Sequence, residues 1–183
     1  IAHNVKRLEA VGRALYTFTD NHDEDRIASK LREPDHLFPV YQLLFTLPGI
    51  PSVYYGSEWG IQGARTRESD EALRPALSLK DMEQTICPIT DHIAALARIH
   101  RDNPELHDGT YKELLLTNRQ CIFERKTDSE RVLVAINADD QPFMAHFDAG
   151  CGTAVDLITG ETHDFGGGSE LAPYSEAYWK MER

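Results

Sequence analysis

The chain has 183 residues, of which 41% are hydrophobic and 27% are charged, and its formal net charge is −11 at pH 7. This length predicts one large or two modest domains, and the composition predicts a soluble, globular protein. The negative charge argues against nucleic acid as a partner, because its phosphates would be repelled, and a neutral ligand fits best. No apolar run approaches 18 residues, so we expect no transmembrane helix and no membrane partner.

The cysteines and histidines form no recognisable disulfide or metal pattern. Cys87, Cys121 and Cys151 are odd in number and too far apart for a CxxC motif, and the eight histidines show no HExxH spacing. We therefore expect three ordinary thiols, and no metal or other cofactor in this chain. The chain opens at Ile1 without an initiator Met or a signal-like segment, so we expect a piece of a longer protein. Such a start leaves the compartment unknown, with the cytoplasm slightly favoured over secretion.

The first third of the chain predicts a strand–helix–strand unit. Residues 4–14 have the spacing of a weakly amphipathic helix, and the aromatic and β-branched residues 15–19 favour a buried strand. Residues 37–47 follow a helical pattern, with Asp35 as the expected N-cap and Pro48-Gly49 as the stop. The short apolar run at 50–55 is then a second strand. This order predicts parallel strands packed on helices.

The rest of the chain predicts a long loop, a helix and many short strands. The loop at 56–79 is rich in charge, and loops of this length are usually functional. A helix is expected over residues 88–101, with Ile89, Ile93, Leu96 and Ala97 on one face. After Gly109, short runs between turn signals predict an antiparallel sandwich. The expected strands are 111–117, 120–126, 131–138, 142–147, 153–157 and 178–182.

A polar cluster follows the first expected strand directly. The strand residues 15–19 lead straight into Asp20, Asn21, His22 and Asp23. A strand that ends in this way is typical of a parallel strand that presents polar side chains to a ligand at its C-terminal end. Because Asp and Asn also favour turns, a loop with an Asx cap is the alternative interpretation.

Three motifs resemble the α-amylase superfamily, glycoside hydrolase family 13. Residues 18–23, Phe-Thr-Asp-Asn-His-Asp, resemble its last conserved region, and residues 48–58, Pro-Gly-Ile-Pro-Ser-Val-Tyr-Tyr-Gly-Ser-Glu, resemble the strand that closes its (β/α)8 barrel. Residues 73–75, Leu-Arg-Pro, resemble a step in the eighth loop. The resemblance implies an α/β plus all-β fold: the last two strand–helix units of a TIM barrel over 1–107, then an antiparallel β-sandwich over 108–183. Barrel units 1–6 are absent.

The resemblance implies a fragment of a retaining α-glucan hydrolase that acts on α-1,4 bonds. Asp23 is then the carboxylate that stabilises the transition state, and His22 is a substrate-binding residue, whereas the nucleophile and the general acid lie upstream. This chain alone is expected to be inactive. Asn21 is a further substrate-binding candidate, although it is expected to orient the strand end rather than to touch sugar. Arg26 could clamp a carboxylate by paired hydrogen bonds, or be a solvated surface arginine.

Other residues are candidates for lining the cleft, namely Tyr55, Glu58 and Arg74. Glu58 could instead pair with an arginine of the loop, and we favour such a structural role. Arg74 could support the loop through an ion pair. One of Tyr54 and Tyr55 should point into the barrel, because side chains alternate along a strand. Trp59 could stack on a sugar ring, although packing is the favoured role.

Two other functions stay open, and several partners follow from the resemblance. The parent could be a glucanotransferase or an isomerase, or the chain could be a non-catalytic carbohydrate-binding or interaction module on an amylase-like scaffold. The implied substrate is an α-glucan or maltooligosaccharide. Two strands of a barrel expose edges, so the missing N-terminal part of the barrel or a second copy is an expected partner. Calcium in the parent would be bound mostly by the missing part. The tail could bind glucan, but a structural role is favoured.

Overall fold

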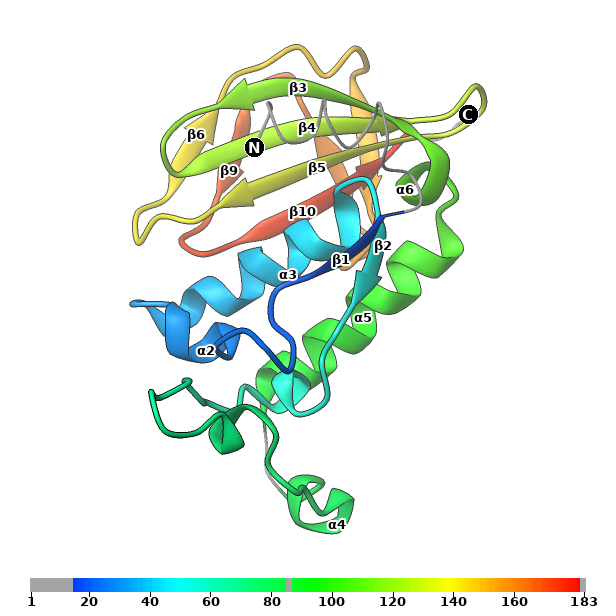
Figure 1. Ribbon diagram of the computed structural model, residues 1–183. Helices are drawn as coiled ribbons and strands as arrows, with labels where there is room; N and C mark the ends of the chain where they lie inside the picture. The colour runs from blue at the N-terminus through cyan, green and yellow to red at the C-terminus, as the bar shows by residue number, and fades with distance from the viewer. Residues whose placement is uncertain (1–14, 85–86, 182–183) are drawn as a thin grey trace.

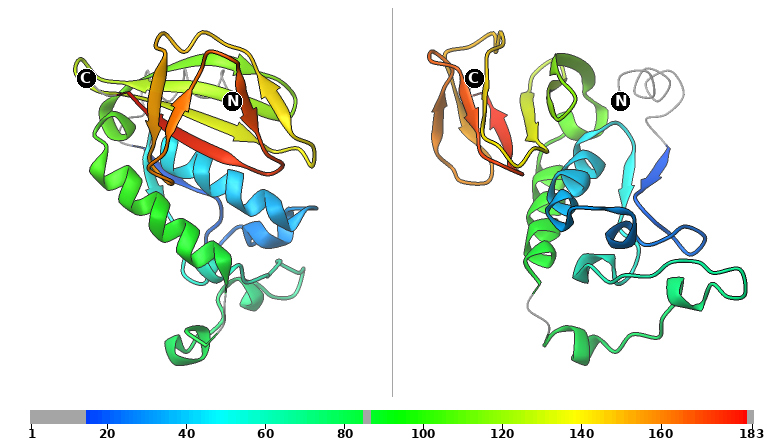
Figure 2. Two further views of the ribbon diagram at one scale, coloured as in Figure 1. Left: turned by 180° about the vertical axis from the view of Figure 1, so that it is seen from behind. Right: turned by 90° about the vertical axis from the view of Figure 1, so that its left-hand side faces the viewer.

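The computed structural model describes residues 15–84 and 87–181, and the helix predicted over residues 4–14 lies outside them. The molecule has two stacked parts: a small parallel sheet with helices, and a larger antiparallel sheet above them (Figure 1). The charged loop that follows the small sheet lies at the end of the molecule away from the large sheet (Figure 2). Within the described residues, no helix is both long and apolar enough to cross a membrane.

The parallel strand pair predicted from the first third of the chain is confirmed. β1 (Tyr16–Phe18) pairs with β2 (Ile50–Ser52), with Tyr16 opposite Ile50. The crossover contains α2 (Ile27–Lys30), the 3-10 turn η1 (Pro34–His36) and α3 (Leu37–Thr46). Two details of the prediction are wrong. The second strand ends at Ser52 rather than at residue 55, and the N-cap of α3 is His36, because Asp35 already belongs to the 3-10 turn.

A glycine ends the crossover where the chain passes close to β1. Gly49 has φ +139°, and a Cβ at this position would lie 2.5 Å from the Thr17 side chain. Only glycine combines this backbone angle with so close an approach. The residues Pro48-Gly49 therefore stop α3 and let β2 lie beside β1.

The loop at 56–79 contains two 3-10 turns, η2 (Ser57–Trp59) and η3 (Glu71–Leu73). Three helices follow: α4 (Leu79–Met82), α5 (Pro88–Asp102) and α6 (Glu105–Asp108). α5 packs against α3 and buries Ile89, Ile93, Leu96 and Ile99. Ala97, which was predicted on this face, is exposed, because the buried face continues from Leu96 to Ile99.

The predicted antiparallel strands form one large and one small sheet. The large sheet has the order β3-β4-β5-β10-β7-β8, and the small one pairs β6 with β9. Their bounds are β3 (Thr110–Leu116), β4 (Gln120–Lys126), β5 (Arg131–Asn137), β6 (Phe143–Ala145), β7 (Thr153–Asp156), β8 (Thr162–Asp164), β9 (Ser169–Leu171) and β10 (Glu176–Lys180). The sequence did not predict β8 and β9, because these three-residue polar strands have no apolar alternation to detect.

The large sheet has a hydrophobic core on each face. Along β5, Val132, Val134 and Ile136 pack with α3 and α5. Leu133 and Ala135 pack with the β6–β9 sheet on the other face. Successive side chains of a strand point to opposite faces, so a strand that is buried on both faces sends alternate residues into two cores. The first core joins helices from before residue 108 to strands from after it. The division into domains at 107/108 stays a prediction, and a continuous core crosses that position.

Candidate functional site

The polar cluster after β1 is anchored by a buried carboxylate. Asp20 is only 1% exposed, and its Oδ2 accepts hydrogen bonds from the Ile27 amide (2.9 Å) and the Ser57 hydroxyl (2.8 Å). These bonds connect the end of β1 to the start of α2 and to the turn after β2. The sequence analysis placed Asp20 in the polar cluster without a role of its own, and it did not single out Ser57. The signal in the sequence was an aspartate immediately after an apolar strand.

An Asx turn projects the next two side chains outward. Asn21 Oδ1 accepts hydrogen bonds from the amides of Asp23 (2.8 Å) and Glu24 (3.0 Å). The turn geometry that was the alternative interpretation is therefore present. It leaves the side chains of His22 and Asp23 both 59% exposed, with His22 Nε2 3.1 Å from Asp23 Oδ2. The turn thus presents an imidazole and a carboxylate together at the surface.

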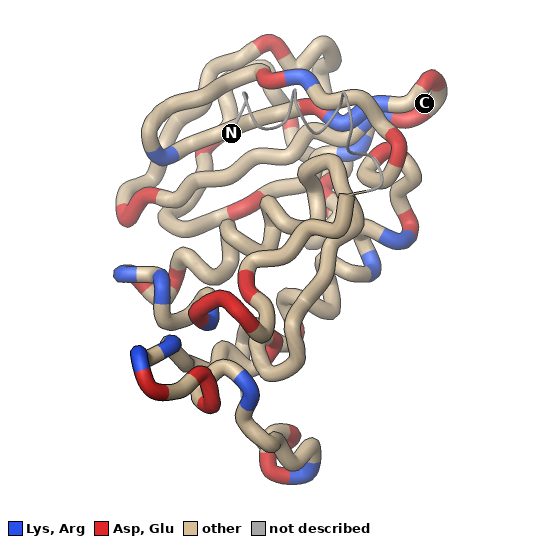
Figure 3. The backbone as a smooth tube through the Cα atoms, in the orientation of Figure 1, with Lys and Arg blue, Asp and Glu red and all other residues tan. Residues whose placement is uncertain are grey.

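Two arginines of the 56–79 loop approach the same carboxylate. Arg74 Nη2 lies 3.5 Å from Asp23 Oδ1 and 2.9 Å from Asp70 Oδ2, and its Nε donates to the His22 carbonyl (3.3 Å). Arg65 Nη2 lies 4.0 Å from Asp23 Oδ1 and 3.8 Å from Asp70 Oδ2. Charged residues of both signs gather on this loop (Figure 3). The predicted ion pair of Arg74 is present, and Asp70 is its nearer partner and Asp23 its more distant one.

Arg26 does not lie where either sequence interpretation placed it. It is fully buried, so the prediction of a solvated surface arginine is wrong. Its hydrogen-bond acceptors are the Tyr55 and Leu73 carbonyls and the Ser57 hydroxyl, and no described carboxylate is clamped. The guanidinium also lies 4.2 Å from the centre of the Tyr54 ring. The guanidinium therefore donates its hydrogen bonds to groups inside the protein, and no part of the side chain is exposed to solvent.

The remaining candidates, Tyr55, Trp59 and Glu58, differ in their exposure and in their hydrogen bonds. Tyr55 is 42% exposed, and its hydroxyl donates to the Pro75 carbonyl at 3.0 Å. Trp59 is half-buried. Glu58 pairs with no arginine in the part of the chain that the structure describes, so that expectation is wrong. Its Oε2 is buried without a hydrogen-bond partner, while its carbonyl accepts from Thr90 Oγ1 (2.7 Å).

The exposed cluster has the chemistry of a polar-ligand site. An accessible carboxylate accepts hydrogen bonds from hydroxyl groups, and an imidazole and a guanidinium donate them. The ion pairs around Asp23 are exposed and long, so a ligand can replace them at little energetic cost. Among residues 15–84 and 87–181, no group of three or more His, Cys, Asp or Glu side chains could hold a metal ion.

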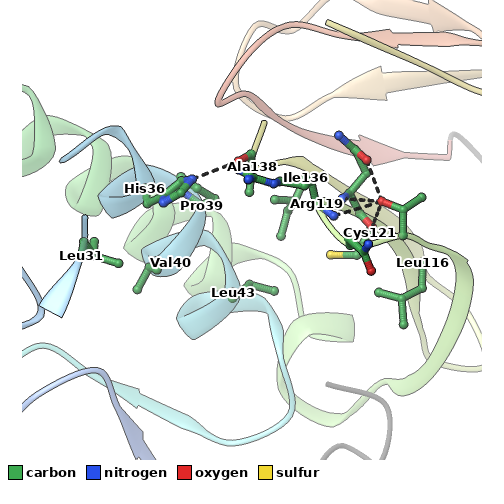
Figure 4. A pocket seen from close by; sticks show the side chains of 13 residues that line it. Leu31, His36, Pro39, Val40, Leu43, Leu116, Arg119, Cys121, Ile136 and Ala138 are labelled. Carbon is green, nitrogen blue, oxygen red and sulfur yellow. Dashed lines mark hydrogen bonds between the residues drawn. The ribbon is translucent and has the colours of Figure 1, made fainter. Parts of the chain in front are cut away.

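A separate apolar groove lies between α3 and the β3–β4 turn (Figure 4). It encloses about 270 Å³ and none of the candidate site residues line it. Val40 and Leu43 face it from the helix, and Leu116 and Ile136 face it from the sheet. Cys121 also lines it, and burial raises the pKa of this thiol to about 11, which keeps it protonated and unreactive.

Comparisons with known proteins agree on one family. The family model described as the alpha amylase catalytic domain matches residues 1–108. A cyclomaltodextrin glucanotransferase of Paenibacillus macerans is 32% identical over 67% of this chain, and an alpha-amylase of Niallia circulans is 31% identical over 66%. The chain spans only 16% and 22% of these two relatives. The crystal structure of the alpha-amylase from Geobacillus thermoleovorans, complexed with acarbose, superposes with a TM-score of 0.85 at 19% identity. That match covers 99% of this chain and 42% of the other.

Proposed function

The chain belongs to the alpha-amylase family, and from this premise we propose that it is the C-terminal part of a retaining α-glucan hydrolase acting on α-1,4 bonds. The complete polypeptide that contains it is called the parent below. Residues 1–107 form the last two strand–helix units of the parent's (β/α)8 barrel, and residues 108–183 form its β-sandwich domain. The observation that carries the proposal is the exposed His22–Asp23 pair at the C-terminal end of a parallel strand, the end at which such barrels bind ligands.

Asp23 is assigned to transition-state stabilisation. Its carboxylate accepts hydrogen bonds from sugar hydroxyls and favours the distorted, oxocarbenium-like ring, while His22 donates a hydrogen bond to the same sugar. The Asx turn of Asn21 supports this role, because it fixes the backbone of both residues. The nucleophile and general acid, which retaining enzymes hold about 5–5.5 Å apart, are assigned to the part of the parent outside this chain.

The loop residues are assigned to the wall of the cleft. Arg74 is the best placed, because it contacts both the Asp23 carboxylate and the His22 carbonyl. Tyr55 is partly exposed and its hydroxyl donates to the carbonyl of Pro75, the residue after Arg74, whereas Glu58 is a weaker candidate because its Oε2 is buried. The ligand in this proposal is a neutral α-glucan or maltooligosaccharide, which would not be repelled by the net charge of −11. We assign no metal to this chain, and any calcium in the parent is assigned to residues outside it.

The small parallel sheet supports the assignment to a larger barrel. Tyr16 is 65% exposed and Ile50 52% exposed, although both lie in strands. β1 and β2 pair only with each other among the described residues, which leaves one edge of each strand open. Apolar strands with open edges call for more strands beside them. In this proposal, the rest of the barrel covers them, and in the isolated chain a second copy takes its place.

The test is the release of reducing sugar from soluble starch and maltodextrins by the parent and by this chain alone. We expect activity from the parent and none from the chain. Hydrolysis by the chain alone would mean that a carboxylate pair within it does the chemistry, and Asp23 with Glu58 would be the first pair to substitute. A parent that binds glucan without cleaving it would instead indicate a non-catalytic carbohydrate-binding module.

A glucanotransferase is the second candidate, because one of the similar proteins named above is a cyclomaltodextrin glucanotransferase. Transfer and hydrolysis share the first chemical step and differ in the acceptor, which is a sugar hydroxyl or water. Chromatography of the products of the parent distinguishes the two. Hydrolysis is supported by linear maltooligosaccharides together with one new reducing end for each bond cleaved. Transfer is supported by products that form without a gain in reducing ends.

A further inference from the structure

We propose that Arg26 is a positioning residue that holds Arg74 against Asp23 by fastening both ends of the 56–79 loop. This inference deepens the proposed function and rests on it for the role of Asp23. The fastening itself is called the Arg26 latch, and it consists of the three hydrogen bonds that the guanidinium donates to Tyr55, Ser57 and Leu73. It assigns to Arg26 an action through other residues rather than a contact with substrate.

The latch joins segments that are far apart along the chain. Arg26 Nη1 donates to the Tyr55 carbonyl (2.6 Å) and to Ser57 Oγ (3.1 Å), where the loop begins. Arg26 Nη2 donates to the Leu73 carbonyl (2.8 Å), near the other end of the loop. A single planar guanidinium therefore sets the distance between the two ends. Lysine cannot do the same, because its single nitrogen lacks this fixed fork of donors.

Backbone contacts hold the middle of the loop to the same segment. The Arg26 amide donates to the Gly63 carbonyl (2.9 Å), and the Gly63 amide donates to Ser29 Oγ (2.8 Å). A Cβ at Gly63 would lie 2.3 Å from the Ala72 carbonyl oxygen, so the loop folds tightly on itself here. The amide of Arg65 donates to Asp25 Oδ1 (2.7 Å). Three hydrogen bonds from two loop residues, Gly63 and Arg65, thus hold the loop on residues 25–29.

The latch acts on Asp23 through Arg74, the residue that follows Leu73 in the chain. Leu73, whose carbonyl the latch binds, directly precedes Arg74, whose Nη2 lies 3.5 Å from Asp23 Oδ1. The Arg74 side chain is 47% exposed, and exposed ion pairs contribute little to holding a loop in place. The buried bonds of Arg26 are stronger, because the donor is charged and solvent is excluded. Arg74 therefore stays near Asp23 because Arg26 holds its backbone.

The surroundings of Arg26 allow a buried cation without a carboxylate in direct contact. Its guanidinium carbon lies 4.2 Å from the Tyr54 ring centre and 5.1 Å from the Tyr55 ring centre, within the range of cation–π attraction. Ser57 Oγ, which accepts from Arg26, donates in turn to the buried Asp20 carboxylate (2.8 Å). The charge is thus balanced through one hydroxyl. Arg26 is built into the turn and cannot reach a ligand.

The test uses the parent with the substitution Arg26→Lys, and Arg125→Lys as the matched control. Arg125 is also fully buried and also donates to carbonyls, those of Thr46 and Gly109, but it lies in β4 rather than beside Asp23. Activity on maltodextrin is measured at a temperature at which circular dichroism shows every variant to be folded. We expect Arg26→Lys to lower kcat/KM by about tenfold or more, and Arg125→Lys to lower it by less than about twofold.

A double-mutant cycle with Arg74→Ala separates positioning from a general structural effect. Arg74→Ala alone should lower kcat/KM about as much as Arg26→Lys, and adding Arg26→Lys to it should cost less than about a further twofold. Additive losses, or equal losses in Arg26→Lys and Arg125→Lys, overturn the proposal. Because Arg74 is exposed, its variant should fold even if Arg26→Lys does not.

Hydrogen exchange distinguishes failure of the latch from failure of the proposed function. In Arg26→Lys, amides of residues 60–75 should exchange faster, while those of α5 should not change. Unchanged exchange in the loop overturns the latch, whatever the activity. If the loop opens but the parent cleaves no α-glucan, or if Asp23→Asn keeps full activity, the proposed function is wrong and the latch stands as a structural device.

Discussion

Two regions of this molecule are rich in ionisable side chains, and they use them in opposite ways. At the turn after β1, Asp23 and Arg74 are about half exposed, and their contact is 3.5 Å long. At the junction of α3 and α5 with the large sheet, His92 and Glu176 are only 11% and 13% exposed, and His92 Nδ1 lies 3.0 Å from Glu176 Oε1. The first region keeps its charges available to a ligand, and the second uses polar groups to join two parts of the fold.

The hydrogen bonds at the junction determine where a proton lies. His92 Nε2 lies 3.3 Å from the Phe38 carbonyl, which can only accept, so Nε2 carries the hydrogen. In a neutral ring, Nδ1 is then an acceptor, and Glu176 must donate to it. Burial raises the pKa of Glu176 to about 8 and lowers that of His92, which favours this neutral pair. The comparison teaches that a buried carboxyl group facing an imidazole nitrogen serves as a hydrogen-bond donor, whereas the exposed carboxylate of Asp23 stays open to a ligand.

The largest expected effect in the comparison comes from the exposed carboxylate. Asp23→Asn in the parent should lower kcat by about 10²–10³-fold, because a neutral amide stabilises the developing positive charge poorly. The melting temperature should hardly change, since the Asp23 side chain is 59% exposed. Glu24→Gln is the control, because Glu24 is a neighbouring exposed carboxylate that pairs only with Lys30 among its described contacts. Loss of activity in both variants would contradict a specific role for Asp23.

The buried carboxylate beside it should affect stability instead. Asp20→Ala leaves the buried donors of Ile27 and Ser57 without their acceptor and should lower the free energy of unfolding by about 2–4 kcal/mol. Asp148→Ala is the control, since exposed Asp148 accepts one hydrogen bond from Gly150 in a turn. Its expected cost is below about 1 kcal/mol. Chemical unfolding of the parent measures both, and equal costs would show that burial does not matter here.

The junction should respond to pH with a defined sign. Folded Glu176 keeps its proton up to about pH 8, whereas its unfolded pKa is near 4.5, so the folded chain holds one extra proton between these values. Its contribution to stability therefore falls as pH rises through this window, by up to about 1.4 kcal/mol per pH unit. Glu176→Gln keeps a donor for His92 and removes the titration.

The melting temperature of the parent, measured from about pH 5 to about pH 8.5, tests this. The melting temperature of Glu176→Gln should rise relative to that of the wild type as pH rises. The difference between the two should stop growing above about pH 8. His92 is present in both proteins, so its own titration largely cancels in the difference. Parallel curves for the two proteins would contradict a protonated Glu176 in the folded state.

The smallest effect is expected from the outermost arginine. Arg65 approaches Asp70 at 3.8 Å and Asp23 at 4.0 Å, and its side chain is 53% exposed. Arg65→Ala should therefore change KM by less than about twofold and stability by less than about 0.5 kcal/mol. Activity assays at low and high salt measure both this variant and Arg74→Ala. A larger loss in Arg65→Ala than in Arg74→Ala would reverse the order of importance inferred from the distances.

The sequence by itself determined the features that depend on neighbours along the chain. The spacing of apolar residues predicted α3, α5 and most strands of the large sheet, and the order of elements predicted that β1 and β2 are parallel. The motifs at 18–23 and 48–58 identified the family, which the family model at residues 1–108 confirms. These features are local, because helix periodicity, turn residues and short motifs are written in consecutive positions.

Only the tertiary structure decided what each charged residue does. Arg26 and Arg74 belong to the same residue type and flank the same cluster, yet one is fully buried and the other is 47% exposed. Apart from Asp70, an i,i+4 neighbour of Arg74, their partners lie 29 to 52 positions away along the chain. Packing sets such contacts, and packing also decides how much water surrounds each charge. The function of an ionisable side chain depends on that solvation, and so it emerges only when distant segments meet.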